Sequence, residues 1–221
     1  MIALRSYLRQ WQRAPTGLRG FCTADEDKYL ELKQLKDIKS EEFYDRQAHE
    51  RRYFYYIDLQ GRLFLEDTRP KNIATSLKST KFLRFFFSQV RPNGIVQCKI
   101  KEEEEFLEYP FRSPCGKEMN FIKCADRAFV HEDLPYDALL TGTLRISLST
   151  GRLYHDVQTK HIASGTPEGV ALVRSQLAVE LGKHIDVHNL PDDIDAEQDV
   201  RSLVVGDFKW EDQHYAIHAI E

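Results

Sequence analysis

The chain has 221 residues, 42% of them hydrophobic and 11% aromatic, enough to bury a core in one large domain or two small ones. Its formal net charge is −4, and no apolar run approaches the roughly 20 residues of a membrane-spanning helix, so we expect a soluble protein. The four cysteines show neither zinc-ribbon spacing nor the density of a disulfide scaffold, which indicates reduced thiols.

Residues 1–21 are predicted to form a cleavable mitochondrial presequence. They combine apolar positions on one side of a helix with four arginines and no acid, the composition of a transit peptide. The arginines are Arg5, Arg9, Arg13 and Arg19. The alternative is an amphipathic helix that belongs to the fold or lies on a membrane surface.

The presequence predicts a location in the mitochondrial matrix and a mature chain that starts near Cys22. Loss of the four arginines leaves 27 basic against 35 acidic residues, so the formal charge falls from −4 to −8. That acidity opposes binding to nucleic acid, which requires neutralisation of phosphates.

Residues 22–52 are dense in charges of both signs, with Tyr29, Leu32, Leu35 and Ile38 near helical spacing. This pattern predicts a charged helical or mobile lead-in.

Residues 53–135 are predicted to form a first hairpin, helix and sheet unit. A hairpin is expected at Tyr53–Ile57 and Arg62–Glu66, because the two runs are rich in β-forming residues and a turn signal separates them. A helix is expected from Pro70 to about Val90. Two strands then follow, at Ile95–Ile100 and Phe106–Phe111, around the four acids Glu102–Glu105.

Residues 136–221 are predicted to repeat that order. A hairpin is expected at Leu144–Leu148 and Arg152–His155, and a helix from Thr166, where threonine precedes proline. A closing hairpin is expected at Asp207–Trp210 and His214–Ile220.

The two halves also share short stretches of similar sequence, which predicts an internal duplication of a hairpin–helix–hairpin unit. Gly61–Phe64 (GRLF) returns ninety positions later as Gly151–Tyr154 (GRLY), and Phe82–Arg84 faces Leu172–Arg174 at the same offset. A one-sided sheet with one helix buries little by itself, so the predicted class is α+β, with antiparallel sheets and packed helices.

Several of these segments resemble the eukaryotic uncharacterised protein family 0598. The residues that carry the resemblance are YFYYID at 53–58, SPCG at 113–116, Asp126-Arg127 and GRLYH at 151–155. The similarity extends from about Tyr53 to Ile185. It implies a mitochondrial protein and no assigned activity, so it supplies no catalytic roles.

Cys115 is the candidate nucleophile, because proline and glycine flank it in a predicted tight turn that would hold its thiol in place. A reactive thiolate needs a base or a cation, for which Lys117, His131 and His155 are candidates. His155 is also a candidate general base. The alternatives are a buried structural cysteine and a histidine that is only a hydrogen-bonded bystander.

A small anionic ligand could bind around the strand that follows Cys115, since the guanidinium fork suits carboxylates and phosphates. The candidate residues are Arg112, Glu118, Asn120, Asp126 and Arg127. In the alternative, Asp126 and Arg127 cap a turn and pair locally.

No metal site or cofactor is predicted. Cys115, Cys124, His131 and His155 offer four ligand types that zinc accepts, but their spacing matches no standard site. Phosphate-binding, dinucleotide, hydrolase and metalloprotease motifs are absent from the sequence.

These observations predict a non-enzymatic module of the mitochondrial matrix that binds a protein or a small anionic ligand through residues 113–127. An enzyme that uses Cys115 as nucleophile and an RNA-associated mitochondrial factor are the alternatives.

Overall fold

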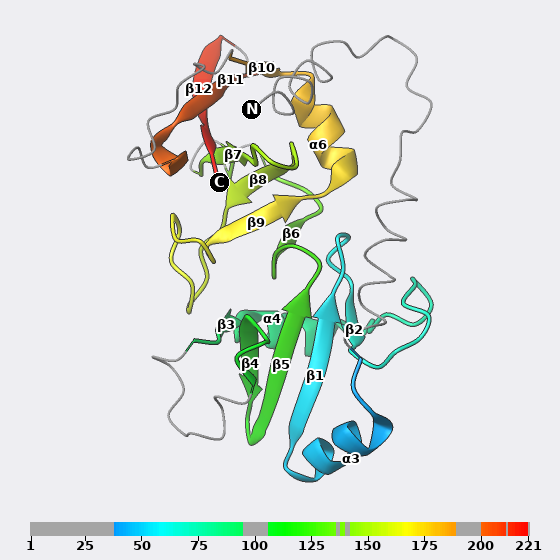
Figure 1. Ribbon diagram of the computed structural model, residues 1–221. Coiled ribbons are helices and arrows are strands. Elements are labelled where there is room, and N and C mark those ends of the chain that lie inside the picture. Colours follow the sequence, from blue (N-terminus) through cyan, green and yellow to red (C-terminus); the bar gives the residue numbers. More distant parts are fainter. Residues whose placement is uncertain are drawn as a thin grey trace. The chain divides into compact units, whose positions relative to one another are not determined.

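The computed structural model describes residues 38–94, 106–135, 138–139, 142–188, 200–210 and 212–220. The predicted presequence and the expected strand at residues 95–100 lie outside the described residues, as do Glu102–Glu105. The chain forms two compact units, and each contains one sheet (Figure 1). None of the helices within the described ranges has the length and apolar character that a membrane crossing requires.

Unit 2 contains Cys22–Val130 and Val157–Gly169, and its five strands are ordered β2-β1-β5-β4-β3. Its elements are α3 (Glu41–His49), β1 (Arg52–Ile57), β2 (Leu63–Leu65), α4 (Thr80–Ser88), β3 (Arg91–Pro92), β4 (Phe111–Cys115) and β5 (Glu118–Cys124).

Both faces of this sheet are packed, because neighbouring residues of a strand point to opposite sides. Tyr55 and Ile57 of β1 lie in the cluster that contains Phe86 of α4, which crosses one face of the sheet (Figure 1). Phe54 lies in a second cluster with Phe106, Tyr109 and Phe121, to which α3 adds two rings.

Of the described residues, unit 1 contains His131–Asp156 and those from Val170 to Ile220. Its elements are β7 (Leu144–Ile146), β8 (Leu153–Asp156), β9 (Val170–Val173), α6 (Ser175–Gly182), β10 (Ile185–Val187), the 3-10 helix η3 (Val200–Ser202), β11 (Val204–Trp210) and β12 (Gln213–Ala219). With β6 (Val130–His131), which begins at the unit boundary, the strands form a sheet ordered β10-β11-β12-β7-β8-β9-β6. The sequence-based boundary after residue 135 differs from the division after residue 130, and Val157–Gly169 returns to unit 2.

The predicted α+β class is confirmed, although both sheets are mixed. Most pairs are antiparallel, whereas β1 runs parallel to β5 and β12 runs parallel to β7. The predicted hairpins β1–β2, β7–β8 and β11–β12 are present. In the first two, Gly61 and Gly151 adopt φ values of +75° and +69°, which glycine adopts without the steric cost of a Cβ.

The two sheets share a strand order, since β2-β1-β5-β4-β3 corresponds to β8-β7-β12-β11-β10. In each, the first strand of the unit is parallel to the last. The match at an offset of ninety holds for GRLF and GRLY, which lead into β2 and β8. It fails for Phe82–Arg84 and Leu172–Arg174, because the first segment is helical whereas Leu172 and Val173 lie in a strand. The internal duplication stays a prediction.

The helix expected from Pro70 is wrong over its first ten residues, because α4 begins only at Thr80. The side chain of Asn72 accepts hydrogen bonds from the backbone N–H groups of Ala74 and Thr75, at 2.8 and 3.2 Å. This local turn competes with helix formation.

The strand expected at Phe106–Phe111 is also wrong. Residues 106–110 form a turn, in which the Tyr109 N–H donates to the Phe106 carbonyl over 3.0 Å, and β4 starts at Phe111. The side-chain amide of Asn93 donates to the carbonyls of Phe106 and Tyr109, both at 2.9 Å. These bonds hold both rings against the sheet.

The helix expected from Thr166 forms later, as α6. The Thr166 hydroxyl accepts a hydrogen bond from the Gly169 N–H over 3.1 Å, but Val170–Val173 then pairs with β8 as a strand. Pairing of this buried, β-branched run outweighs the capping signal.

Candidate functional site

The predicted tight turn at Ser113–Gly116 is wrong, because Cys115 lies in β4 opposite Glu118 and only Gly116 and Lys117 form the turn. Cys115 packs against the core on the α4 side, and among the described residues its polar contact is the Ser113 hydroxyl, 3.8 Å from Sγ. Ser113 itself donates to the Phe86 carbonyl over 2.8 Å. His131 and His155, the candidate bases, belong to unit 1.

The predicted anion-binding residues do not share one surface. Arg112 and Asn120 are buried on opposite faces of the sheet, and Asn120 donates to the Ser113 carbonyl over 2.7 Å. Glu118 is exposed beside the turn. Arg127 has its Nε 3.5 Å from Asp126 and donates from Nη1 to the Pro167 carbonyl over 3.3 Å, which is the local pairing of the alternative interpretation.

His131 and His155 do come together within unit 1. Their ring centroids are 5.6 Å apart at an interplanar angle of 79°, and His155 is 3% exposed. Nδ1 of His155 donates to the Asp156 carbonyl over 2.8 Å. In the described part of the chain, neither Nε2 has a hydrogen-bond partner, which is rare for buried polar atoms.

Burial makes both imidazoles weak bases. Burial, with a smaller effect of His155, lowers the pKa of His131 from 6.5 to about 4. Burial also lowers the pKa of His155, although the carbonyls of Asp156 and Ala138 and the Asp156 carboxylate oppose it. No group of three or more His, Cys, Asp or Glu side chains that could hold a metal is found within the described ranges.

Stability should therefore fall as the pH drops from 6.5 towards 4. The unfolded chain takes up a proton on His131 at 6.5, whereas the folded chain does so only near 4, so acid favours unfolding in that window. We expect a loss of about 1–2 kcal/mol after allowing for solvent at this half-buried group.

Denaturant unfolding at a series of pH values measures this loss, and His131→Asn should flatten the profile. The exposed His214→Asn is the matched control. The other charged groups near His131 and His155 form ion pairs of their own. Asp156 pairs with Arg145 at 2.8 Å, and Glu132 pairs with Arg174 at 3.3 Å. An unchanged pH profile in His131→Asn would contradict the assignment.

A second polar cluster surrounds the buried Glu66 in unit 2. The Tyr44 and Tyr109 hydroxyls donate to its Oε2 over 2.9 and 2.8 Å. Lys123 Nζ lies 3.0 Å from Oε1 in an ion pair without an aligned hydrogen bond, and Lys123 also pairs with Glu108 at 3.0 Å. This cluster fixes α3 and the turn at residues 106–110 to the sheet.

Burial and the neighbouring charges shift the pKa values of the tyrosines and the lysine in this cluster. Burial, followed by the negative charge of Glu66, raises the pKa of Tyr109, so both tyrosines remain hydrogen-bond donors. Burial alone would lower the pKa of Lys123, but Glu66 and Glu108 outweigh it and raise it. We interpret the cluster as structural, since its polar groups are engaged with one another.

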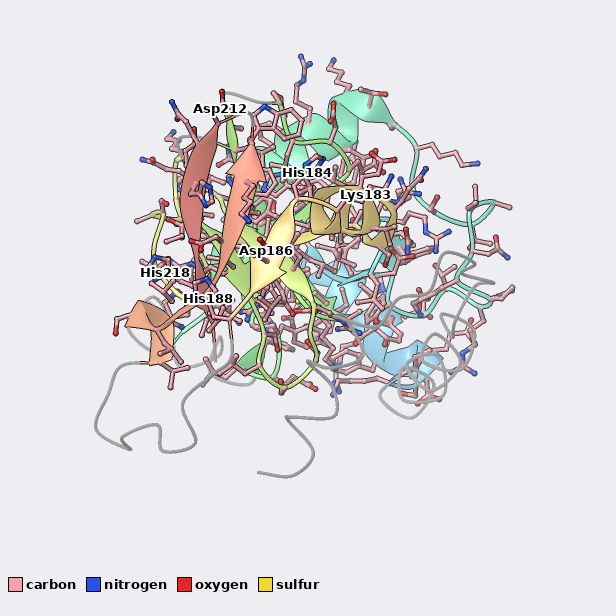
Figure 2. The ribbon with its side chains drawn as sticks, turned by 90° about the horizontal axis from the view of Figure 1, so that it is seen from above. Lys183, His184, Asp186, His188, Asp212 and His218 are labelled. Atoms are coloured by element: carbon pink, nitrogen blue, oxygen red, sulfur yellow. The ribbon has the colours of Figure 1, made fainter. Side chains whose placement is uncertain are left out.

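The outer face of β10–β12 carries exposed charges of both signs. Figure 2 shows Asp186 on β10, with His188 and His218 nearby and Asp212 at the tip of the β11–β12 hairpin. Asp186 is paired with Lys209, and His188 Nε2 lies 2.8 Å from Asp207. His184, at the end of α6, instead packs edge-on against Trp210 with the centroids 5.1 Å apart. This face is therefore largely paired within itself.

The outer side of α4 and the residue just before its N-cap are different, because their cations are exposed and have no ion pair among the described residues. Lys78, Lys81 and Arg84 are exposed, and no ion pair involves them in the part of the chain that the structure describes. Phe85 lies beside them with half of its surface (50%) exposed. We name these four residues the α4 outer surface.

Residues 44–139 match a family model described as "Domain of unknown function (DUF4505)". This range is less than half of the chain and covers β1–β5 and α4, most of unit 2. It also extends past the unit boundary, from His131 to Leu139 of unit 1. No solved structure matches the chain. The resemblance to family 0598 stays a prediction beside this match.

The α4 outer surface lies within the matched region and was missed by the sequence reasoning, although a signal for it exists. No acidic residue occurs between Asp67 and Glu102, whereas eight basic residues do. These are Arg69, Lys71, Lys78, Lys81, Arg84, Arg91, Lys99 and Lys101. The net charge of the whole chain hides this local excess.

Proposed function

We propose that this protein is a non-enzymatic module of the mitochondrial matrix that binds a protein or a small anionic ligand. The α4 outer surface supports this function most, because Lys81 and Arg84 lie on the same helix as the exposed Phe85, and no ion pair in the described part of the chain involves them or Lys78. We assign binding to this surface rather than to residues 113–127, since Arg112 and Asn120 are buried on opposite faces of the sheet.

The matrix location rests on the basic, acid-free sequence of residues 1–21. N-terminal sequencing of the protein from mitochondria should find a start near Cys22. A retained Met1 would overturn the cleavage.

The competing function is an enzyme with Cys115 as nucleophile. A reactive thiol needs a neighbouring base or cation, whereas the hydrogen-bond contact of Cys115 among the described residues is the Ser113 hydroxyl and the residue opposite it in the sheet is the acidic Glu118. Cys124 is a poorer candidate, because burial and then Asp126 raise its pKa to about 12. The structural contacts thus favour binding over catalysis.

Cys115 should react with iodoacetamide at neutral pH no faster than glutathione does, because its described hydrogen-bond contact is the Ser113 hydroxyl, which is neither a base nor a cation. Mass spectrometry of the full chain measures this rate, with Cys98 as an internal comparison and Cys115→Ser as the control. A Cys115 that reacts much faster than both references would overturn the non-enzymatic function.

The second alternative is an RNA-associated factor. The local basic excess around α4 favours it, whereas the net charge of −4 opposes it. Ultraviolet crosslinking in mitochondria tests this alternative. RNA crosslinked to α4 would show that the surface binds RNA and not a protein.

A further inference from the structure

We propose that the α4 outer surface docks an acidic segment of a protein partner. Carboxylates of that segment pair with Lys78, Lys81 and Arg84, while one apolar side chain packs on Phe85. This inference rests on the proposed binding function and names its partner class.

Charge complementarity is the first argument for an acidic partner. Acidic residues pair with several other cations of unit 2, as Asp58 does with Arg62 at 2.6 Å and Glu108 with Lys39 at 2.6 Å. Lys78, Lys81 and Arg84 lack such neighbours in the described chain, and the first turn of α4 contains no acid. The positive electrostatic potential of these three side chains therefore attracts an external anion towards α4.

The exposed ring of Phe85 is the second argument. Phe86, one residue further on, is completely buried, and Phe82 and Phe87 pack against the same core. Phe85 points away from that core, although α4 would stay anchored without it. A single exposed apolar residue is ordinary, but an exposed aromatic ring on the same short helix as Lys81 and Arg84 has the composition of a protein-binding hot spot.

The spacing on α4 sets the form of the partner. Lys81 and Phe85 are four residues apart, and Lys81 and Arg84 are three apart, so the three side chains share one side of the helix. A partner segment with one apolar residue flanked by acids matches this short pattern. Its carboxylates also suit the bidentate donor geometry of Arg84.

A lipid surface or RNA fits this surface less well. Insertion into a membrane needs a broad apolar face, whereas the apolar side of α4 is packed in the core and leaves Phe85 outside. RNA without sequence preference binds along several aromatic platforms and a cationic track. The α4 outer surface has one ring and three cations.

The test uses the purified full chain and a short fluorescent peptide with a central leucine flanked by glutamates. A peptide with glutamines in their place, anionic vesicles and single-stranded RNA are compared by fluorescence anisotropy or cosedimentation. The variants are Lys81→Glu with Arg84→Glu, and Phe85→Ala. Their matched controls, Lys117→Glu and Val179→Ala, alter an exposed cation and an exposed apolar residue elsewhere.

We expect the acidic peptide to bind more weakly as ionic strength rises. The double charge reversal should weaken it by at least about tenfold, and Phe85→Ala by about five- to tenfold. The two controls and the circular dichroism spectra should stay unchanged, and the glutamine peptide should not bind.

Equal binding by wild type and the double charge reversal would overturn the inference, and so would α4-dependent binding of vesicles or RNA without peptide binding. Peptide binding that appears only after Glu102–Glu105 are changed to glutamine would overturn it as well. That result would mean that these four acids of the same chain, and not a partner, bind the α4 outer surface. A fast-reacting Cys115 overturns the proposed function instead, so the two failures are distinguishable.

Discussion

Replacement of Glu66 by alanine should destabilise the protein by about 3–5 kcal/mol, the range for loss of one partner from a buried ion pair. Glu66 is 3% exposed and has Lys123 at 3.0 Å, with the Tyr44 and Tyr109 hydroxyls on its other oxygen. Without the carboxylate, two buried hydroxyls lose their acceptor, and Lys123 loses its more deeply buried partner.

Urea denaturation followed by circular dichroism measures this effect. Glu108→Ala is the matched control, because Glu108 contacts the same lysine at the same 3.0 Å but its side chain is 41% exposed. We expect the control to cost less than about 1 kcal/mol. Glu66→Leu combined with Lys123→Met should recover part of the loss, since both charges are then removed. A Glu66→Ala variant as stable as Glu108→Ala would show that the cluster does not hold the fold.

Replacement of Gly142 by alanine should destabilise the protein by about 1–3 kcal/mol, because the new methyl group has no space. A Cβ at this position would lie 2.2 Å from Cε1 and 2.5 Å from Nε2 of His155. The imidazole is itself buried, and the bond from its Nδ1 to the Asp156 carbonyl fixes it, so it cannot move aside without losing that bond.

A double-mutant cycle isolates this contact. His155→Ala removes the ring that the new methyl group would meet, so the cost of Gly142→Ala should largely vanish in that background. Thermal or urea unfolding of the four proteins gives the coupling energy. If Gly142→Ala costs the same with and without the imidazole, the ring does not occupy the described position.

The sequence contained the local features of the fold but few of its long-range ones. Turn signals at Asp58–Gly61 and Ser149–Gly151 predicted the hairpins correctly, because turn chemistry is set by adjacent residues. Ranges that read as helix or strand at 70–79 and 106–110 form turns instead. There the side chains of Asn72 and Asn93 make hydrogen bonds that periodicity does not reveal.

The candidate sites followed the same division. His155 was named from the sequence and does pair with His131, whereas the residues around Cys115 separate onto opposite faces of a sheet. The buried cluster around Glu66 could not be predicted from the sequence, since a single glutamate after a strand is usually solvated. The basic residues around α4 were visible as a run without acids, but only the fold shows that Lys78, Lys81 and Arg84 have no ion pair among the described residues and that Phe85 is exposed with them.

By itself, the sequence determined the α+β class and the three predicted hairpins, because alternation and turn residues act between near neighbours. The tertiary structure decided which strands pair in parallel, which of the charged residues are buried, and which phenylalanine of Phe85–Phe87 is left outside. These outcomes depend on contacts between residues far apart in the chain, such as the Tyr109 hydroxyl with Glu66 and Phe86 with Tyr55. No local pattern specifies such partners.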